Sequence, residues 1–172
     1  MKFRSGHRGG SAADETGATG VEMALVLPLL VMLIAGVMDF GMVFSDLMSL
    51  RQGVGAGVRH GIVAQSGASS SCTVTGTTAS GDTLSLICLV KDRIALDDAS
   101  TRVKIAFPGS KVRGGSLVIC AQYPMESITT MLDPIMNGEL TSRVEMRIEQ
   151  DLSTLDAAEE TPVDGGDWTW CA

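Results

Sequence analysis

The longest apolar stretch of the chain covers residues 18–38, in which Glu22 is the single charged residue. At about 1.5 Å of rise per residue, a helix of this length extends roughly 31 Å, close to the hydrocarbon thickness of a bilayer. Residues 23–38 have no polar face, whereas a core helix of a soluble domain is normally amphipathic. The pattern therefore predicts a membrane-spanning helix, with a kink or a loosened turn at Pro28, whose ring removes one helical N–H donor.

Beyond residue 38, apolar residues recur at helical spacing, which predicts that the helix continues to about residue 64. Gly53, Gly57 and Gly61 recur at every fourth position on a second face. Each glycine costs about 1 kcal/mol of helix propensity relative to alanine, so this stripe indicates close approach by another element. Packing within the chain's own domain is favoured over contact with a second subunit. The first face comprises Phe40, Phe44, Leu47, Leu50 or Arg51, Val54, Val58 and Ile62.

Three later segments alternate between apolar and polar residues, as strands with one buried face do. They are residues 102–107, 116–123 and 142–152. Together with the continued helix they predict an α+β fold, in which a long N-terminal helix packs on a small antiparallel sheet.

Two shorter helical segments are expected around these strands. The first runs from Leu84 to about residue 95 and follows a Ser/Thr/Gly-rich loop, with Asp82 or Thr83 as its N-cap. The second is a single helical turn around residues 127–132, before the breaker formed by an Asp-Pro pair.

Charge is distributed unevenly along the chain. Residues 1–17 are a Gly- and Ser-rich leader without apolar periodicity, expected to be flexible, and they carry Lys2, Arg4 and Arg8. The part after residue 38 has ten Lys/Arg and seventeen Asp/Glu. The basic N-terminus is therefore expected in the cytoplasm and the acidic remainder outside the cytoplasmic (inner) membrane. An exported domain this acidic is a poor binder of nucleic acid, because that binding requires Lys and Arg against phosphates.

All four cysteines lie on the side predicted to be exported, where disulfides form. Two disulfides are favoured there over free thiols. Four cysteines allow three pairings, and the sequence does not decide among them. A guess from their positions pairs Cys72 with Cys88 and Cys120 with Cys171. No pair has the C-x-x-C spacing of a zinc site, and His60 is distant from all four in sequence, so no metal site is expected.

The exported part divides into a domain, residues 39–152, and an acidic tail, residues 153–172. The tail alone would be mobile by composition. It ends, however, in Trp168, Trp170 and Cys171, a combination that indicates docking on another surface. The chain's own domain is favoured over a partner protein as that surface, because termini are disordered unless tied down.

The edge of the apolar run carries a recognisable pattern. Gly17 precedes Ala18, and Glu22 is the fifth residue after that glycine. The run GVEMALVLPLLVMLIAGVMDFGMVF contains a V-E-M-A-L-V-L-P core and an acidic-Phe-Gly triplet, Asp39-Phe40-Gly41. This part of the chain resembles the TadE-like pseudopilins of the tight-adherence (Flp) type IV pilus system. The resemblance covers residues 17–64, and more loosely residues 101–152, where SRVEMRIEQ is a weaker match.

The resemblance implies a pilin-like fold and a role as a minor structural subunit in pilus assembly. A prepilin peptidase would cleave after Gly17, and Glu22 would pair with the new α-amino group on Ala18 of a neighbouring subunit. The implied partners are the membrane, other pilus or pseudopilus subunits and the peptidase. Whether the protein enters the filament is left open. Independently of the family, a lone carboxylate inside an apolar span indicates function by default. The alternative is that Glu22 only marks the membrane interface and lies among the headgroups; the assembly role is favoured over it.

A second interpretation keeps the leader uncut and makes the protein a single-pass, membrane-anchored envelope binding module. An enzyme is not expected, because the chain has no nucleophile elbow and no glycine-rich phosphate loop. His60, on the predicted helix, is interpreted as an interfacial or surface residue rather than a general base. No cofactor is expected.

Overall fold

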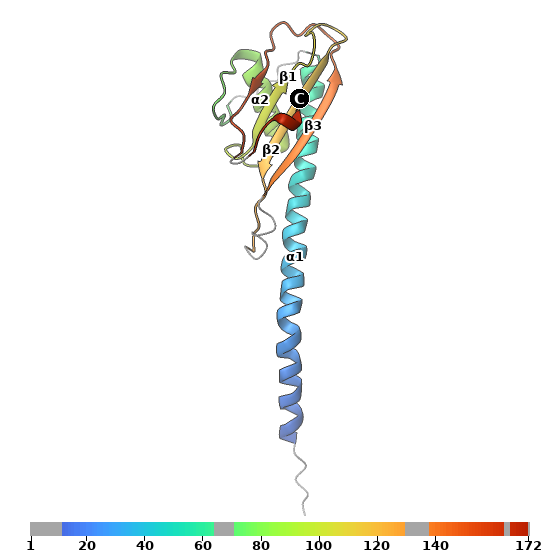
Figure 1. The fold of residues 1–172 in the computed structure, drawn as a ribbon, viewed down its shortest axis with the longest axis vertical. Helices are drawn as coiled ribbons and strands as arrows, with labels where there is room; N and C mark the ends of the chain where they lie inside the picture. Colours follow the sequence, from blue (N-terminus) through green and yellow to red (C-terminus); the bar gives the residue numbers. More distant parts are fainter. Residues whose placement is uncertain (1–11, 64–70, 130–137, 164–165, 172) are drawn as a thin grey trace, which may run out of the picture. The chain divides into compact units, whose positions relative to one another are not determined.

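The computed structural model describes residues 12–63, 71–129, 138–163 and 166–171, with side chains from Thr19 onward. The chain divides into two compact units, Met1–Met38 and Asp39–Ala172. Secondary structure confirms the expected α+β class, in which a long N-terminal helix is followed by a second helix and an antiparallel sheet (Figure 1). The elements are α1 (Ala12–Gly61), α2 (Gly81–Ile94), β1 (Arg102–Ala106), β2 (Ser116–Pro124), β3 (Glu139–Arg147), β4 (Ala158–Glu159) and η1 (Thr169–Cys171).

Helix α1 starts earlier than the sequence predicted and is continuous through Pro28. Residues 12–17 are helical, although the leader was expected to be flexible through Gly17. Alanines at positions 12 and 13 are strong helix formers, and acidic residues at 14 and 15 suit a helix N-terminus. A bend at Pro28 stays a prediction from the sequence.

The first unit exposes an apolar helix surface. Its large apolar side chains are exposed from Val21 to Met38, with Leu25 and Leu29 above 70 %. Within the described residues, α1 is the one helix long and apolar enough to cross a membrane, and only 6 % of its most apolar window is buried. A helix that is apolar all round needs lipid or protein around it. These observations are consistent with a single-pass membrane protein.

In the second unit, α1 buries Leu50, Val54 and Val58 completely. Phe40 and Phe44, which the helical spacing assigned to the same face, are instead 64 % and 58 % exposed. The periodicity identifies which face is apolar, but it does not say how far along the helix the rest of the domain reaches. Coverage by the core begins at Val43 and Leu47, which are partly buried against it.

The glycine stripe packs within the domain, as favoured from the sequence. A Cβ added at Gly53 would lie 2.5 Å from the backbone nitrogen of Ile94, and one at Gly57 would overlap the side chain of Val90. A Cβ at Gly61 would lie 2.7 Å from Leu117 Cδ2. The missing side chains therefore let α2 and β2 approach the backbone of α1.

Helix α2 begins at Gly81, after Ser80, whose side chain makes no capping hydrogen bond. The expected caps are therefore wrong. Asp82 lies in the first turn, where its charge suits the helix N-terminus. Thr83 is buried, and its Oγ1 accepts a hydrogen bond from the backbone N–H of Asp156 at 2.9 Å. The expected helical turn is not formed at residues 127–129, and its remainder lies outside the described residues.

The sheet has the order β3-β2-β1-β4, with every neighbouring pair antiparallel. Strands β1 and β2 lie where alternation predicted them. Strand β3 starts three residues earlier than expected and stops at Arg147, while Ile148 and Leu152 are buried just beyond it. The backbone N–H of Ile148 bonds Gly115 O and that of Leu152 bonds Lys111 O, so this segment pairs with the turn before β2.

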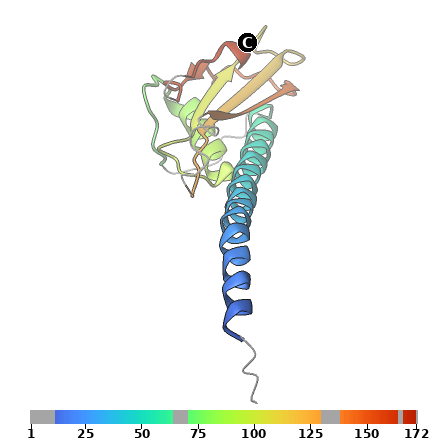
Figure 2. The ribbon, with the colours of Figure 1, turned by 60° about the horizontal axis from the view of Figure 1, so that its bottom comes forward.

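Both faces of β2 are buried, each against a different partner. Leu117, Ile119 and Ala121 join the main core formed with α1 and α2. On the opposite face, Val118 and Cys120 contact Trp168 and Cys171 of the C-terminal segment, which lies on the other side of the strands from α2 (Figure 2). The tail thus belongs to the domain, and β4, which the sequence did not predict, adds it to the sheet edge beside β1.

Candidate functional site

Glu22 lies in the exposed apolar part of α1. Its neighbours Val21 and Met23 are 64 % and 60 % exposed, and Glu22 is exposed as well. The ion pairs between described side chains all lie in the second unit, so no described cation of the chain pairs with Glu22. A carboxylate on an apolar span is costly unless it reaches the headgroups or finds a cation. The position therefore suits a contact supplied from outside the helix.

The peptide bond between Gly17 and Ala18 lies within α1, and Gly17 precedes Glu22 by five residues. The structure describes side chains only from Thr19 onward. Cleavage at this bond stays a prediction from the sequence.

Asp39, the first residue after the apolar run, is 1 % exposed, and each of its two carboxylate oxygens accepts two hydrogen bonds. Its Oδ2 accepts hydrogen bonds from Ser127 Oγ at 2.7 Å and Thr129 Oγ1 at 2.6 Å. Its Oδ1 accepts from the backbone N–H groups of Ile128 at 3.1 Å and Thr129 at 3.2 Å. We refer to Asp39 with residues 127–129 as the Asp39 clamp. Four donors satisfy the buried carboxylate and fix the segment after β2 to α1.

The sequence placed Asp39 in a family triplet but gave it no structural role. A charge directly after a long uncharged run was the available signal. Its partners are about ninety positions away in sequence, however, and no local pattern identifies them.

Lys91 and Glu160 form an ion pair at 2.9 Å, and neither side chain is exposed. Glu160 Oε1 also accepts from the backbone N–H of Thr75 at 2.9 Å, and Oε2 from that of Val103 at 2.8 Å. Lys91 Nζ also donates to the carbonyls of Thr73 at 2.6 Å and Asp98 at 3.0 Å. The pair is therefore fully hydrogen-bonded. It joins α2, β1, the tail and the segment before α2 that carries Cys72, which we call the cysteine loop (residues 71–80). In the sequence, Glu160 is one of several acidic residues of the tail, and no pattern there indicates a buried partner.

Two disulfides fasten the domain: Cys72 with Cys88, and Cys120 with Cys171. This is the pairing guessed from the positions of the cysteines in the sequence. The second one anchors the C-terminal segment, where Trp168 Nε1 donates to Glu160 O at 2.9 Å and Trp170 Nε1 to Asp167 O at 2.8 Å. The tryptophans and Cys171 thus dock the tail on its own domain, as favoured from the sequence.

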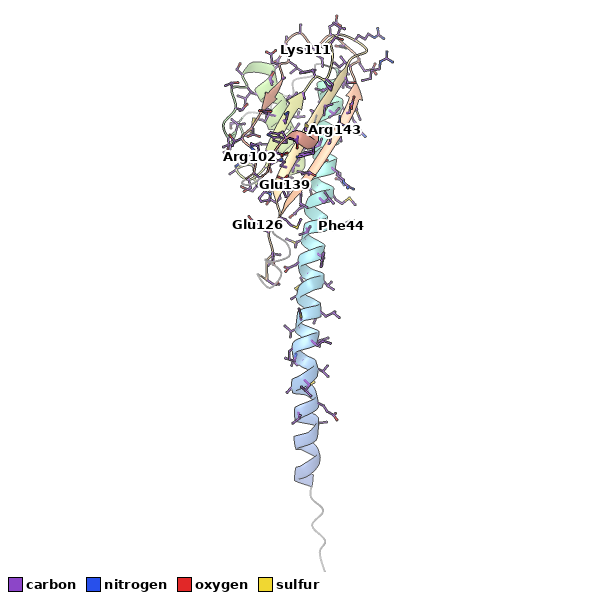
Figure 3. All side chains as sticks on the ribbon, in the orientation of Figure 1. Phe44, Arg102, Lys111, Glu126, Glu139 and Arg143 are labelled. Carbon is purple, nitrogen blue, oxygen red and sulfur yellow. A yellow bond between two sulfur atoms is a disulfide. The ribbon has the colours of Figure 1, made fainter. Side chains whose placement is uncertain are left out.

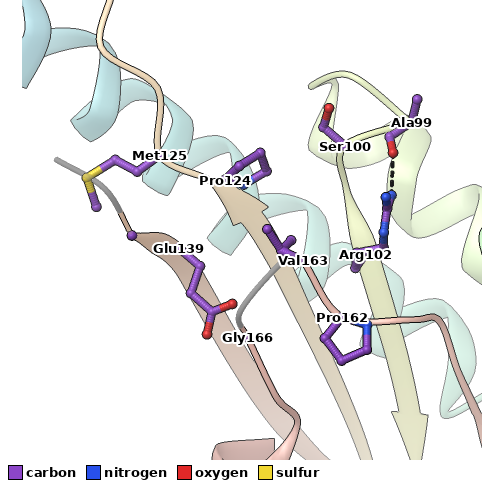
Figure 4. A pocket seen from close by; sticks show the side chains of 10 residues that line it. Ala99, Ser100, Arg102, Pro124, Met125, Glu139, Pro162, Val163 and Gly166 are labelled. Atoms are coloured by element: carbon purple, nitrogen blue, oxygen red, sulfur yellow. Dashed lines mark hydrogen bonds between the residues drawn. The ribbon is translucent and has the colours of Figure 1, made fainter. Parts of the chain in front are cut away.

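A cavity of about 640 Å³ lies between the ends of β1, β2 and β3 and the C-terminal segment (Figure 4). Burial, and then the negative charge of Asp167, raises the pKa of the Glu139 carboxyl. The described lining residues include no histidine or cysteine, and no three described His, Cys, Asp or Glu residues form a metal-ligand group. The lining residues are Ala99, Ser100, Arg102, Pro124, Met125, Gly138, Glu139, Pro162, Val163 and Gly166.

The family comparison places residues 17–59 within the model of the TadE-like protein family. The match begins at Gly17, includes Glu22 and Asp39, and ends in the glycine stripe of α1. The looser resemblance over residues 101–152 is not part of it. No curated protein and no solved structure matches the chain. The match points to an association with the tight-adherence pilus.

Proposed function

Since residues 17–59 carry the TadE-like sequence, we propose that this protein is a structural, non-enzymatic subunit acting in tight-adherence pilus assembly as a minor pseudopilin. Helix α1 anchors it once in the cytoplasmic membrane, with the N-terminus inside and the disulfide-bonded domain outside. A prepilin peptidase removes the leader after Gly17.

The observation that carries the proposal is the position of Glu22 within the family match. It is an exposed carboxylate on an exposed apolar helix, five residues beyond the proposed cleavage site. Cleavage creates an α-amino group on Ala18, and a neighbouring subunit presents that amine at a similar depth in the membrane. A pair formed there is little screened by water, so it contributes more than a surface ion pair's ~0–1 kcal/mol, less the cost of desolvation.

The exported domain supports a structural role. Its tail, cysteine loop, sheet and α2 are joined by two disulfides and by one buried ion pair. Such cross-linking suits a rigid head carried on a helix, because it keeps the domain folded while the helix is moved between membrane and assembly.

The experiment compares variants of the full chain in a host with the complete pilus system. Glu22→Ala should still be cleaved but should lose co-purification with the other pilus components. Met23→Ala removes a neighbouring exposed side chain without removing charge, and it should keep both properties. Wild-type co-purification of Glu22→Ala would leave the assembly role without support.

Processing is tested in the same host with glycine variants. Gly17→Leu should block cleavage and Gly17→Ala should slow it, because a peptidase must approach the scissile backbone closely and glycine has no Cβ. Gly20→Ala is the control, since no atom lies within 4 Å of its added Cβ, and it should be cleaved normally. Normal cleavage of Gly17→Leu would exclude Gly17 as the processing site.

The second candidate is an uncut, membrane-anchored binding module. The open cavity beside Glu139 and Arg102 favours it, because a partner side chain would fit there. An intact leader on the protein in its own membrane would support this function over the first.

A further inference from the structure

We propose that the Asp39 end of the exported domain rests on the outer membrane–water interface of the bilayer that α1 crosses, with Ile128 as an apolar contact to lipid. The inference rests on the membrane anchoring in the proposed function and adds a second, peripheral contact to it.

The Asp39 clamp fixes the position of Ile128 along the axis of α1. Asp39 follows directly on Met38, the last residue of the apolar run. The backbone nitrogen of Ile128 lies 3.1 Å from Asp39 Oδ1. Ile128 is therefore held at the level of α1 where the hydrocarbon of the bilayer ends.

The side chains at this level are apolar and exposed. Ile128 is 62 % exposed, and Phe40 and Phe44 on α1 are 64 % and 58 % exposed. Phe40 lies two residues beyond Met38, or about 3 Å along a helix, which is within the headgroup region of one leaflet, roughly 5–8 Å thick. Phe44 lies six residues or about 9 Å beyond Met38, just outside that region. Ile128 and Phe40 thus coincide with the interfacial region, where burying an apolar side chain is favourable.

The polar groups nearby fit the same place. The carboxylate of Asp39 is shielded by its four donors, so it can lie beside hydrocarbon without an unsatisfied charge. Asp46 and Glu126 interact electrostatically with each other at this edge. Since both are acidic, the attraction to lipid is apolar rather than ionic, and added salt should not weaken it.

The opposite end of the domain provides a matched reference. Outside α1, the large exposed apolar side chains of the described residues are Ile128 and Val112. Val112 precedes β2 and Ile128 follows it, and a nine-residue strand extends about 27 Å. Figure 3 shows Lys111, next to Val112 in sequence, at one end of the domain, and Glu126 and Phe44 at the other end. Val112 should therefore stay in water.

The test uses full-length protein in phosphatidylcholine vesicles with and without brominated acyl chains, which quench nearby tryptophan. Three variants each add one tryptophan: Ile128→Trp, Val112→Trp and, within the span, Leu30→Trp. The signal is the difference from the parent protein, whose Trp168 and Trp170 give a constant background. Brominated lipid should reduce the added emission of Leu30→Trp and Ile128→Trp, in low and high salt, and leave that of Val112→Trp unchanged.

The reference variants separate two kinds of failure. Quenching of Leu30→Trp without quenching of Ile128→Trp would overturn the lipid contact and leave the anchor intact. A blue-shifted but unquenched Ile128→Trp would assign the surface to a second copy of the chain, which also overturns it. An unquenched Leu30→Trp would overturn the anchoring itself, and the inference with it.

Discussion

Lys91 and Glu160 are the residues at which most parts of the domain meet. Neither side chain touches water, yet every charged atom has partners, in the ion pair at 2.9 Å and in hydrogen bonds to four backbone groups. A satisfied buried pair of this kind adds little net stability over an apolar pair, but the loss of one partner leaves an uncompensated buried charge. The pair therefore makes the domain depend on correct docking of its tail.

Glu160→Gln keeps the size of the side chain and removes the charge that balances Lys91. We expect the free energy of unfolding to fall by about 3–5 kcal/mol, measured by denaturant unfolding of the full chain in detergent. Glu159→Gln is the matched control, since its side chain is 60 % exposed in a surface pair with Lys104, and it should cost less than about 1 kcal/mol. Equal effects of the two variants would contradict the role of the buried pair.

At the scale of elements, the contact between α1 and α2 depends on the absence of side chains. Gly53 and Gly57 let Ile94 and Val90 lie against the backbone of α1. The sequence indicated this close contact, because each glycine inside a helix lowers helix propensity and a regular spacing of four residues places these glycines on one face. Packing within the chain's own domain was favoured from the sequence, with the sheet as the expected partner. The structure shows that Gly53 and Gly57 face α2 instead, and that Gly61 faces β2.

Gly53→Ala should destabilise the domain by about 1–3 kcal/mol, because the new Cβ meets the backbone of Ile94, which cannot move aside as a side chain can. Gly55→Ala is on the same helix with no atom within 4 Å of its added Cβ, and it should stabilise by up to about 1 kcal/mol through helix propensity. Thermal unfolding of both variants in the same detergent gives the comparison. Stabilisation of the domain by both variants would show that helix propensity, and not packing at Gly53, decides the effect.

What could be predicted from the sequence followed from local pattern. Alternation located β1 and β2, and the pairing guessed from the cysteine positions is the one that the structure has. Strand β4 has two residues and no pattern of its own, because it forms only where the docked tail meets β1. The partners of Asp39 and Glu160 were likewise not predictable, since each is chosen by tertiary contact across tens of residues.

At the scale of the whole molecule, the two disulfides constrain very different lengths of chain. The pair Cys72 and Cys88 is separated by 16 positions, and the pair Cys120 and Cys171 by 51. Loop-closure entropy predicts about 3 kcal/mol for the first and about 4 kcal/mol for the second. The longer one also keeps Trp168 against Val118 on the outer face of the sheet.

Replacing both cysteines of a pair by alanine tests this order. Cys120→Ala with Cys171→Ala should lower the free energy of unfolding more than Cys72→Ala with Cys88→Ala, and only the first should expose Trp168 to an aqueous quencher. Denaturant unfolding and iodide quenching measure the two effects. A larger loss from the shorter pair would contradict the tail as a main fastening of the domain.

Processing of this chain as a pilus subunit is tested most directly by the intact mass of the protein extracted from its own membrane. We expect a chain that begins at Ala18, with both disulfides intact, and a chain that retains the leader in the Gly17→Leu variant. A wild-type protein that still begins at Met1 would exclude processing after Gly17 and, with it, the proposed function.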